Sequence, residues 1–311
     1  QQPSGMVCDV VRFNKARNNR INSKPPLASW AVWAVFQETG DTGFLEEMYP
    51  KLLKYHRWWY ANRDLDQNGL CEYGSVNDEF KRPGFESGMD HAARFADAQL
   101  VKHAAGYSYD QESVDLNAYL WQEKGFLAKM ADRLNRSDDA GILRAEAERL
   151  RGTILGRFWD DETGYFYDWS LRENKQIQIV GCEGWTPLFT GLATPEQAER
   201  VKRMMFDPER FGTGVLLGTL EHGNKLFDPV NGYWRGPIWL DQAYFGIQGL
   251  RTYGFNEEAD RLTHLLLTGL EGLADSGGAI RENYNPLDGT GLKAHHFSWS
   301  AGHLLMLLMD Q

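Results

Sequence analysis

Two carboxylates four positions apart are the residues with the clearest potential for chemistry. Glu86 and Asp90 flank Ser87 and Gly88. Because Gly88 permits a sharp backbone turn, we predict that Asp90 lies where a helix begins. A carboxylate at that position can serve as an N-cap, which is the common structural role, or as a catalytic acid or base. The pattern alone leaves both interpretations open.

A second group of oxygen-bearing residues follows the spacing of a calcium loop. Its candidate ligands are Asp64, Asp66, Asn68, Leu70 (through its backbone carbonyl) and Glu72. Ca²⁺ takes about six to eight oxygen ligands, and this alternation gathers them around one point. Where an EF-hand has its final glutamate this chain has Ser75, so a further acid must come from elsewhere. A solvated turn is the structural alternative.

Four later segments each combine aromatic side chains with a carboxylate, an arginine or an amide at the expected end of a helix. The candidate substrate-binding residues in them are Glu183, Trp185, Trp234, Arg235, Trp239, Asp241, Tyr284, Phe297 and Trp299. Aromatic platforms with a few polar groups are how a site holds a carbohydrate. For any one segment core packing is the simpler explanation, but the recurrence favours a sugar site.

Pairs of helices must position these segments. We expect first helices, apolar on most sides, over 27–39, 116–134 and 238–253, and second helices with one charged face over 42–62, 142–158 and 257–273. A helix that is apolar all round must be buried, whereas an amphipathic one faces water. The alternation predicts an all-α (α/α)6 toroid, with an inner ring of helices inside an outer ring. A helical solenoid is the alternative, but the irregular repeats argue against it.

Connections and boundaries complete the expected architecture. We predict a turn over 137–139, and a turn at 163–164 followed by a short strand that 175–180 could pair with. We expect about ten helices, fewer than six closed pairs require, and place the missing ones before residue 26. Residues 1–311 are therefore expected to form a single catalytic barrel domain, incomplete at its N-terminus, with a missing N-terminal segment of the same protein as a partner.

Composition excludes some classes of function. The net charge of −10 argues against a nucleic-acid partner, and no apolar run reaches the length of about 18 residues needed to cross a membrane. Three widely spaced cysteines form neither a metal motif nor a disulfide framework. The chain starts with Gln1 and shows no signal-type segment, so the compartment, periplasmic or secreted or cytoplasmic, stays open.

The motifs together resemble glycoside hydrolase family 63, which includes processing α-glucosidase I and bacterial relatives. The resemblance covers nearly the whole chain, through Lys24-Pro-Pro-Leu-Ala-Ser-Trp30, Asn62-Arg-Asp64, Glu72-Tyr-Gly74, Glu86-Ser-Gly-Met-Asp90, Gln111-Glu-Ser113, Glu183-Gly-Trp185, Trp234-Arg-Gly236, Glu282-Asn-Tyr-Asn-Pro286 and Phe297-Ser-Trp-Ser300. The Glu86 to Asp90 piece is shared with trehalases. The family's Trp-Pro-Trp-Asp-type opening segment has no counterpart here.

The resemblance implies an inverting hydrolase of α-glucosidic bonds in oligosaccharides. Asp90 matches the family's general acid and Glu282 its general base, so their carboxylates are expected roughly 6.5–9.5 Å apart. The resemblance also implies a structural Ca²⁺, with Glu112 supplying the missing acid. The rival functions are a trehalase-like inverting hydrolase of the same clan and a non-catalytic carbohydrate-binding fragment. Turnover of α-glucosides, against binding without turnover, separates these classes.

Overall fold

The computed structural model describes residues 1–212, 214–274 and 277–310, and the chain divides into two compact units. The first unit comprises Gln1–Asp90, Asp97–Phe158 and Asp168–Ile177. The second comprises His91–Ala96, Trp159–Tyr167 and Gln178–Gln311. The candidate acid Asp90 therefore belongs to the first unit and the candidate base Glu282 to the second. The single domain over 1–311 and the 6.5–9.5 Å carboxylate separation stay predictions.

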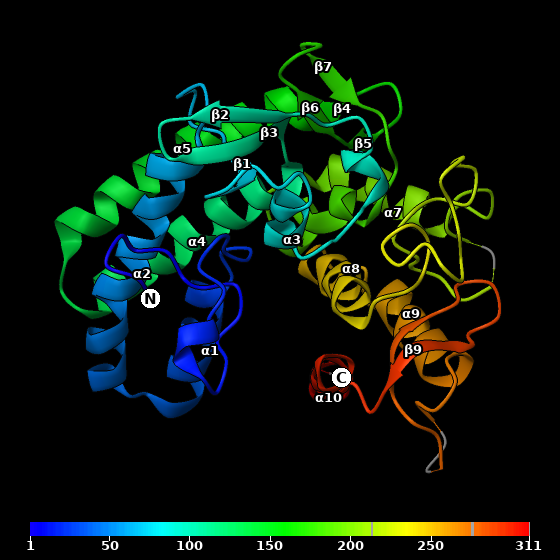
Figure 1. Cartoon of the computed structure of the whole chain (residues 1–311). Helices are drawn as coiled ribbons and strands as arrows, with labels where there is room; N and C mark the ends of the chain where they lie inside the picture. Colours follow the sequence, from blue (N-terminus) through cyan, green and yellow to red (C-terminus); the bar gives the residue numbers. More distant parts are fainter. Residues whose placement is uncertain (213, 275–276, 311) are drawn as a thin grey trace. The chain divides into compact units, whose positions relative to one another are not determined.

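Helices form most of the first unit (Figure 1). They are η1 (Lys15–Arg17), α1 (Ala28–Thr39), α2 (Thr42–Arg63), α3 (Arg82–Ser87), α4 (Val114–Arg133) and α5 (Ser137–Phe158). Gly40 ends α1 in the left-handed region, and Asp41 then caps α2 by accepting a hydrogen bond from the amide of Phe44 at 2.9 Å. Leu45 and Tyr49 of α2 and Leu127 of α4 lie in a buried core that α1 and α5 complete.

The turn predicted over 137–139 is wrong, because Ser137, Asp138 and Asp139 form the first turn of α5. Acidic side chains are favourable in a first helical turn, where they face the positive end of the helix dipole. The connection from α4 is instead made by Asn135, whose φ of 58° places it in the left-handed region that asparagine tolerates.

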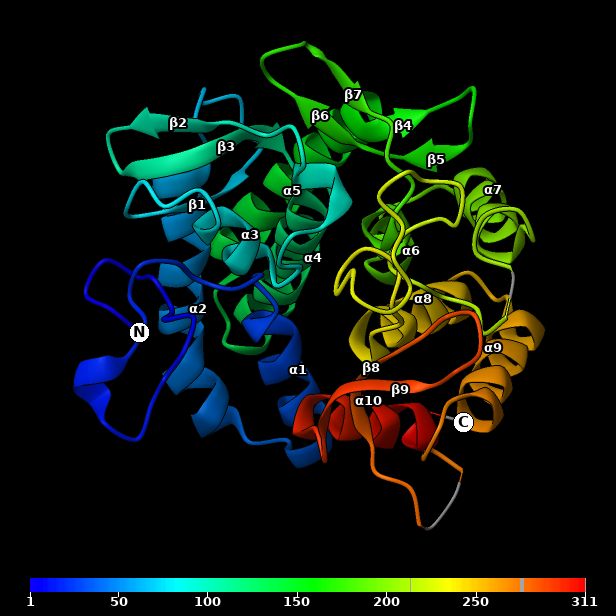
Figure 2. The same ribbon diagram turned by 45° about the vertical axis from the view of Figure 1, so that its right-hand side comes forward.

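An antiparallel sheet lies at one end of α2 and α4 (Figures 1 and 2). Its strands are β1 (Glu72–Ser75), β2 (Leu100–His103), β3 (Gly106–Glu112), β6 (Asp168–Ser170) and β7 (Lys175–Ile177), in the order β1-β3-β6-β7 with β2 also paired to β3. The strand predicted after the turn at 163–164 pairs with 175–180 only at its end: Asp168 begins β6, which pairs with β7, whereas Tyr165 and Phe166 pair with Asp160 and Trp159. The register sets Glu72 opposite Glu112, which brings two acids of the predicted calcium site together.

The second unit is also mainly helical, with two short hairpins (Figure 2). Its elements are η2 (Ala93–Phe95), β4 (Trp159–Asp160), β5 (Tyr165–Phe166), η3 (Cys182–Trp185), α6 (Thr186–Phe189), α7 (Pro195–Phe206), α8 (Leu240–Thr252), α9 (Asn256–Gly269), β8 (Arg281–Tyr284), β9 (Gly291–His295) and α10 (Ser298–Met309). The helix predicted over 257–273 ends earlier, at Gly269, and the one over 238–253 is confirmed as α8.

Burial separates the helices only partly as expected. Helices α4 and α8 are buried along most of their length, whereas α5, α7 and α9 bury one face, as the alternation predicts. Full burial is wrong for α1, which buries only Ser29 and Val32. Helix α10, which was not predicted from the sequence, buries only Ser300 and Leu307. Apolar side chains therefore reach the surface on both helices, as they do at Leu305 and Met309 of α10.

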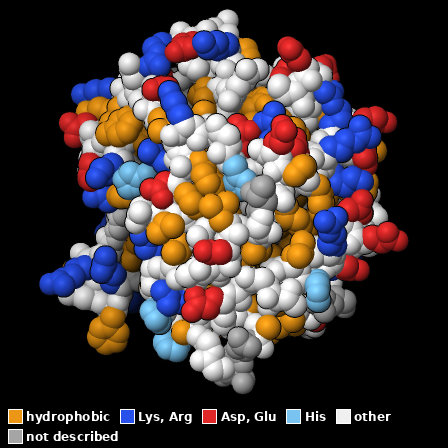
Figure 3. Space-filling model, turned by 90° about the vertical axis from the view of Figure 1, so that its right-hand side faces the viewer, with side chains coloured by type: hydrophobic (Ala, Val, Ile, Leu, Met, Phe, Trp, Pro, Cys, Tyr) orange, Lys and Arg blue, Asp and Glu red, His pale blue; other side chains and the backbone are white. Residues whose placement is uncertain are grey.

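Charged side chains of both signs lie on the surface. On the face in Figure 3, acidic and basic side chains are interspersed, with hydrophobic side chains between them. In the part of the chain that the structure describes, no helix combines the length and apolar composition needed to cross a bilayer.

Candidate active site

Asp90 follows the end of a helix rather than starting one. Helix α3 stops at Ser87 because Gly88 takes a φ of 79°, and the Ser87 hydroxyl then accepts a hydrogen bond from the amide of Met89 at 3.0 Å. His91, next in the chain, has a φ of 63°, and only the three-residue η2 follows. The prediction that a helix begins at Asp90 is therefore wrong. An N-cap role and a pKa lowered by a helix N-terminus are both removed.

The carboxyl of Asp90 is poised to hold a proton. Burial raises the pKa of Asp90 to about 6, against a lowering by the ammonium of Lys24 and a further raising by the carboxylate of Asp9. A general acid must be protonated near its working pH, which is what this environment favours.

Glu86, the other acid of the motif, anchors the segment that carries Asp90. It is fully buried, and its Oε2 accepts hydrogen bonds from Arg63 Nε and the amide of Gly74, both at 2.7 Å. Its Oε1 accepts from Arg63 Nη2 at 3.0 Å and from the amide of Ser23 at 2.8 Å. A carboxylate with four donors and a bidentate guanidinium fixes geometry well. Glu86 thus ties α3 to α2, β1 and the N-terminal segment.

Glu282 lies on β8 in the second unit, and two donors hold its carboxylate. The hydroxyl of Tyr233 donates to Oε1 at 2.8 Å, and the amide of Ala294 on β9 donates to Oε2 at 3.3 Å. The hydroxyl of Ser300 donates to the Glu282 backbone carbonyl at 3.1 Å. Tyr284, the last residue of β8, pairs with Ile238. These contacts fix the position of the Glu282 carboxylate, and a general base must be held within reach of the proton that it accepts.

Aromatic side chains gather next to Tyr233, which donates to Glu282. The rings of Trp234 and Trp239 stack 4.1 Å apart at an interplanar angle of 8°. Tyr233 meets Trp239 edge-on at 5.0 Å, and Trp299 lies 6.0 Å from Trp239 and 6.4 Å from Phe297. Trp299 is 40% exposed, so the cluster runs from the core to the surface. An aromatic face that reaches solvent is suited to stacking on a sugar ring.

The remaining candidate substrate residues lie deeper or serve the backbone. Trp185 and Tyr284 are fully buried, so they act on a ligand only through their neighbours. Glu183 and Asp241 are also buried, and burial raises the pKa of Asp241. Arg235 donates from Nε to the backbone carbonyl of His91 at 2.7 Å, in the loop directly after Asp90.

The predicted calcium ligands converge. Carboxylate oxygens of Asp66, Glu72 and Glu112 lie within 4.8 Å of one another. One buried oxygen each of Asp64, Glu72 and Glu112 accepts no hydrogen bond within the described residues. Burial raises the pKa values of Glu72 and Glu112, and the neighbouring carboxylates raise them further. Three carboxylate oxygens this close together, with buried oxygens of Asp64 and Glu72 that accept no hydrogen bond from the described residues, fit a hard cation.

Hydrogen bonds shape the same loop and partly compete for its oxygens. Asn68 donates from its amide group to Asp66 at 2.9 Å and to Glu112, while its own oxygen accepts from the Leu70 amide at 2.8 Å. Arg157 lies 3.2 Å from Glu112. The loop is therefore pre-formed, with a guanidinium at its edge.

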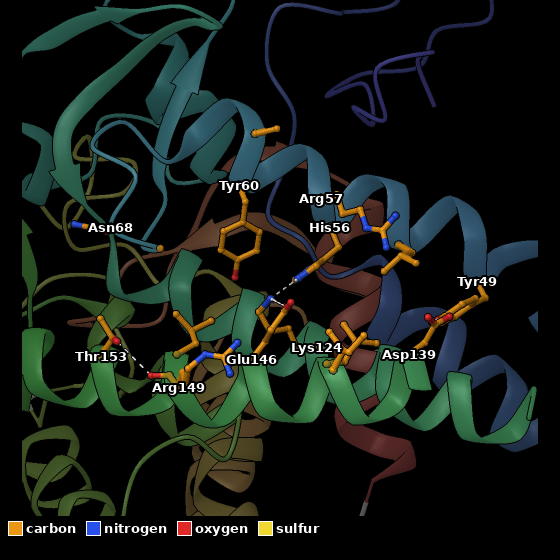
Figure 4. Close-up of a pocket in the computed structure, with 16 residues that line it drawn as sticks. Tyr49, His56, Arg57, Tyr60, Asn68, Lys124, Asp139, Glu146, Arg149 and Thr153 are labelled. Atoms are coloured by element: carbon orange, nitrogen blue, oxygen red, sulfur yellow. Dashed lines mark hydrogen bonds and ion pairs between the residues drawn. The ribbon is translucent and has the colours of Figure 1, made fainter. Parts of the chain in front are cut away.

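A cavity of about 710 Å³ opens between α2, α4 and α5 (Figure 4). Neither catalytic candidate lines it. At its floor Lys124 Nζ donates to His56 Nε2 at 2.9 Å and to Glu146 at 2.8 Å, and His56 Nδ1 donates to Glu123 at 2.6 Å. An ammonium only donates, so His56 carries its proton on Nδ1. This series of hydrogen bonds links helices α2, α4 and α5.

Some of the residues that hold the site were not identified from the sequence. Tyr233 adjoins the Trp234 motif, but nothing in its spacing shows a bond to Glu282. Arg63 and Lys24 lie inside quoted motifs, yet their partners are 23 and 61 positions away. A pairing of this kind leaves no trace in a single sequence.

Solved structures share this fold. The GH63 mannosylglycerate hydrolase from Thermus thermophilus in complex with glucose matches 100% of this chain and 85% of its own, at a TM-score of 0.79 and 24% identity. Neutral trehalase from Saccharomyces cerevisiae matches 94% of this chain and 63% of its own, at a TM-score of 0.76 and 20% identity. The fold is that of a class of helical glycoside hydrolases.

The particular family follows from sequence. Residues 1–300 match the family model of the mannosylglycerate hydrolase MGH1-like glycoside hydrolase domain. A mannosylglycerate hydrolase sequence of Thermus thermophilus is 28% identical over 331 aligned positions, which cover 90% of this chain and 75% of the relative. A Selaginella moellendorffii enzyme of the same name is 25% identical, over 95% of this chain and 67% of its own. The chain belongs to the MGH1-like family of GH63 glycoside hydrolases.

Proposed function

We propose that this protein hydrolyses an α-glycosidic bond with inversion, using Asp90 as general acid and Glu282 as general base. The observation that carries the assignment is the contrast between the two carboxyl groups. The site environment favours the protonated form of Asp90 and gives Glu282 two hydrogen-bond donors. We further propose that the helices of both units form one (α/α)6 barrel, as the family resemblance implies.

The chemistry needs each group once per turnover. Asp90 gives its proton to the glycosidic oxygen as the bond to the anomeric carbon breaks. Glu282 takes a proton from the water that attacks the opposite face of that carbon. Tyr233 and the Ala294 amide hold the Glu282 carboxylate while it does so. Trp299, the exposed member of the aromatic cluster, stacks on the sugar ring, and the buried Trp239 packs beside Trp299.

The substrate is proposed from the relatives and from the residues. The relatives are named mannosylglycerate hydrolases, so mannosylglycerate is the first candidate. α-Glucosidic oligosaccharides, expected from the family resemblance, are the second, and trehalose is the third because a trehalase shares the fold.

One panel of assays tests the assignment. The purified chain is given mannosylglycerate, α-glucosides and trehalose, and the first anomer released is identified by NMR. We expect turnover of one class, with a β-anomer first. Initial release of the α-anomer would show a retaining reaction and overturn the mechanism. Binding of these sugars by the chain without turnover would favour a carbohydrate-binding fragment.

We also propose that Ca²⁺ is held by Asp64, Asp66, Asn68, the Leu70 carbonyl, Glu72 and Glu112. When bound, the ion supplies charge neutralisation for the clustered carboxylates and ties the loop before β1 to β3. A cation at about 100 times its Kd would stabilise the fold by about 2.7 kcal/mol.

Thermal unfolding tests the calcium proposal. We expect EDTA to lower the Tm and added Ca²⁺ to restore it, and Glu112→Gln to abolish the response. Glu148→Gln, at an exposed acid of α5, is the matched control and should respond like the parent. An identical Tm with EDTA and with excess Ca²⁺ would show that the loop is only a turn.

A further inference from the structure

An ion pair in the N-terminal segment contacts the segment that leads to the candidate acid, within the first unit. The side chain of Asp9 is only 7% exposed, and its Oδ1 lies 3.2 Å from the ammonium of Lys24. Asp9 Oδ2 accepts a hydrogen bond from Asn19 Nδ2 at 2.7 Å, and the Asp9 amide donates to the carbonyl of Asn22 at 3.2 Å. These contacts fix the Asp9 carboxylate in place before any ligand arrives.

The other member of the pair is fixed to the segment that carries Asp90. The Lys24 ammonium donates to the backbone carbonyl of Phe85, in the last turn of α3. The Lys24 carbonyl accepts from the Tyr55 hydroxyl at 2.6 Å. The amide of the preceding Ser23 donates to Glu86. Lys24 is therefore held both at its side chain and at its backbone, close to the turn that carries Asp90.

The charges of Lys24 and Asp9 determine how this ion pair affects Asp90. A lone ammonium beside a carboxyl group favours the ionised form, and an acid catalyst must be protonated. Both members of the pair act on Asp90, in opposite directions. Of the other ionisable groups around this turn, Arg63 and Glu86 neutralise each other, and Tyr109 stays neutral because burial raises its pKa to about 12.

We propose that Asp9 is a positioning residue for the candidate acid: it pairs with Lys24, cancels the ammonium charge that acts on Asp90, and so keeps Asp90 protonated for catalysis. This inference rests on the proposed role of Asp90. It assigns to the N-terminal segment a function in the reaction, although neither Asp9 nor Lys24 donates or accepts the transferred proton.

The alkaline limb of the pH–rate profile reports the protonation of the acid. We expect Asp9→Asn to move that limb to lower pH by about one unit, because it leaves the ammonium uncompensated. Lys24→Gln should move the limb to higher pH. The double variant should return it close to the parent. A structural contact alone predicts no such opposite shifts.

Controls and variants keep the test decisive. Glu47→Gln and Lys51→Gln make the same charge changes in an exposed pair on α2 and should leave the limb unmoved, because solvent and salt screen that pair. Lys24 has a side chain that is 39% exposed, so its variant should fold even where Asp9→Asn does not. Circular dichroism checks that the Lys24→Gln and Asp9→Asn variants fold.

Each outcome has one meaning. Unmoved limbs in Asp9→Asn and Lys24→Gln, with Asp90→Asn inactive, overturn the ion-pair inference and leave the proposed function standing. A raised KM in Lys24→Gln with an unmoved limb also overturns it, by showing that Lys24 contacts the substrate. Full activity of Asp90→Asn removes the proposed acid itself, and with it the inference.

Discussion

The surroundings of Asp90, the proposed acid, and Glu282, the proposed base, differ in burial and in hydrogen bonding. Asp90 sits after a tight turn, where burial raises its pKa and the nearby ammonium is already paired with Asp9. Glu282 sits on a hairpin strand and receives hydrogen bonds from Tyr233 and the amide of Ala294. Two identical functional groups thus lie in different surroundings: one is partly desolvated, and the other is held by two hydrogen-bond donors.

The two regions also differ in how they are held. The Asp90 turn is fixed indirectly, because Glu86 anchors the helix before it through Arg63. The Glu282 strand is fixed directly, by its β9 partner and by Ser300 at its backbone. The acid should therefore be sensitive to substitutions of remote charged residues, and the base to substitutions of its immediate donors.

The largest effect should come from the two carboxyl groups themselves. We expect Asp90→Asn and Glu282→Gln each to lower kcat by roughly 10²–10⁴-fold, with the fold retained. A glycoside with an activated leaving group needs no acid, so it should rescue Asp90→Asn and not Glu282→Gln. Asp138→Asn on α5 is the control. Equal rescue of both catalytic variants would contradict the assignment of roles.

Removal of the anchor should cost stability next. Glu86→Gln leaves the Arg63 guanidinium buried without its charge partner, so we expect a loss of about 3–5 kcal/mol in the free energy of unfolding. Urea denaturation measures it. The exposed control Glu47→Gln should show no measurable change. A stability close to that of the parent would mean that the segment before Asp90 is held by other contacts.

The pH profile comes third. Since the pKa of Asp90 is raised to about 6, the acid is protonated below that pH and ionised above it. We expect kcat/KM to fall about tenfold per pH unit above about pH 6. A profile that stays flat to above about pH 8 would show that another group is the acid.

The smallest effect concerns the base. Tyr233→Phe removes one donor to the Glu282 carboxylate, and a hydrogen bond to a charged group contributes about 1.5–3 kcal/mol. We expect kcat to fall by about tenfold with little change in KM. Tyr253→Phe, which removes a hydroxyl bonded to the carbonyl of Ala193, is the matched control. Equal kcat values in the parent and in Tyr233→Phe would mean that Ala294 alone positions the base.

Sequence patterns predicted the structure well where interactions between residues close in sequence determine it. Periodicity located α1, α2, α4 and α8, and the alternation of oxygen-bearing residues identified a loop whose acids converge in space. Local pattern failed at Asp90 and at Asp138. An aspartate near a glycine can start a helix, follow one or lie in its first turn, and the residues on either side do not distinguish these cases.

The sequence by itself determined the positions of the main helices, the family and the chemical identity of the candidate groups, because residue types and short spacings define each of these. Tertiary structure alone decided the burial of Asp90 and the two donors that hold the Glu282 carboxylate. Burial depends on everything packed around a side chain. The pairs that matter, Lys24 with Asp9 and Phe85, Arg63 with Glu86, and Tyr233 with Glu282, join residues distant in the chain. Desolvation and long-range charge act through space, so only the folded chain sets them.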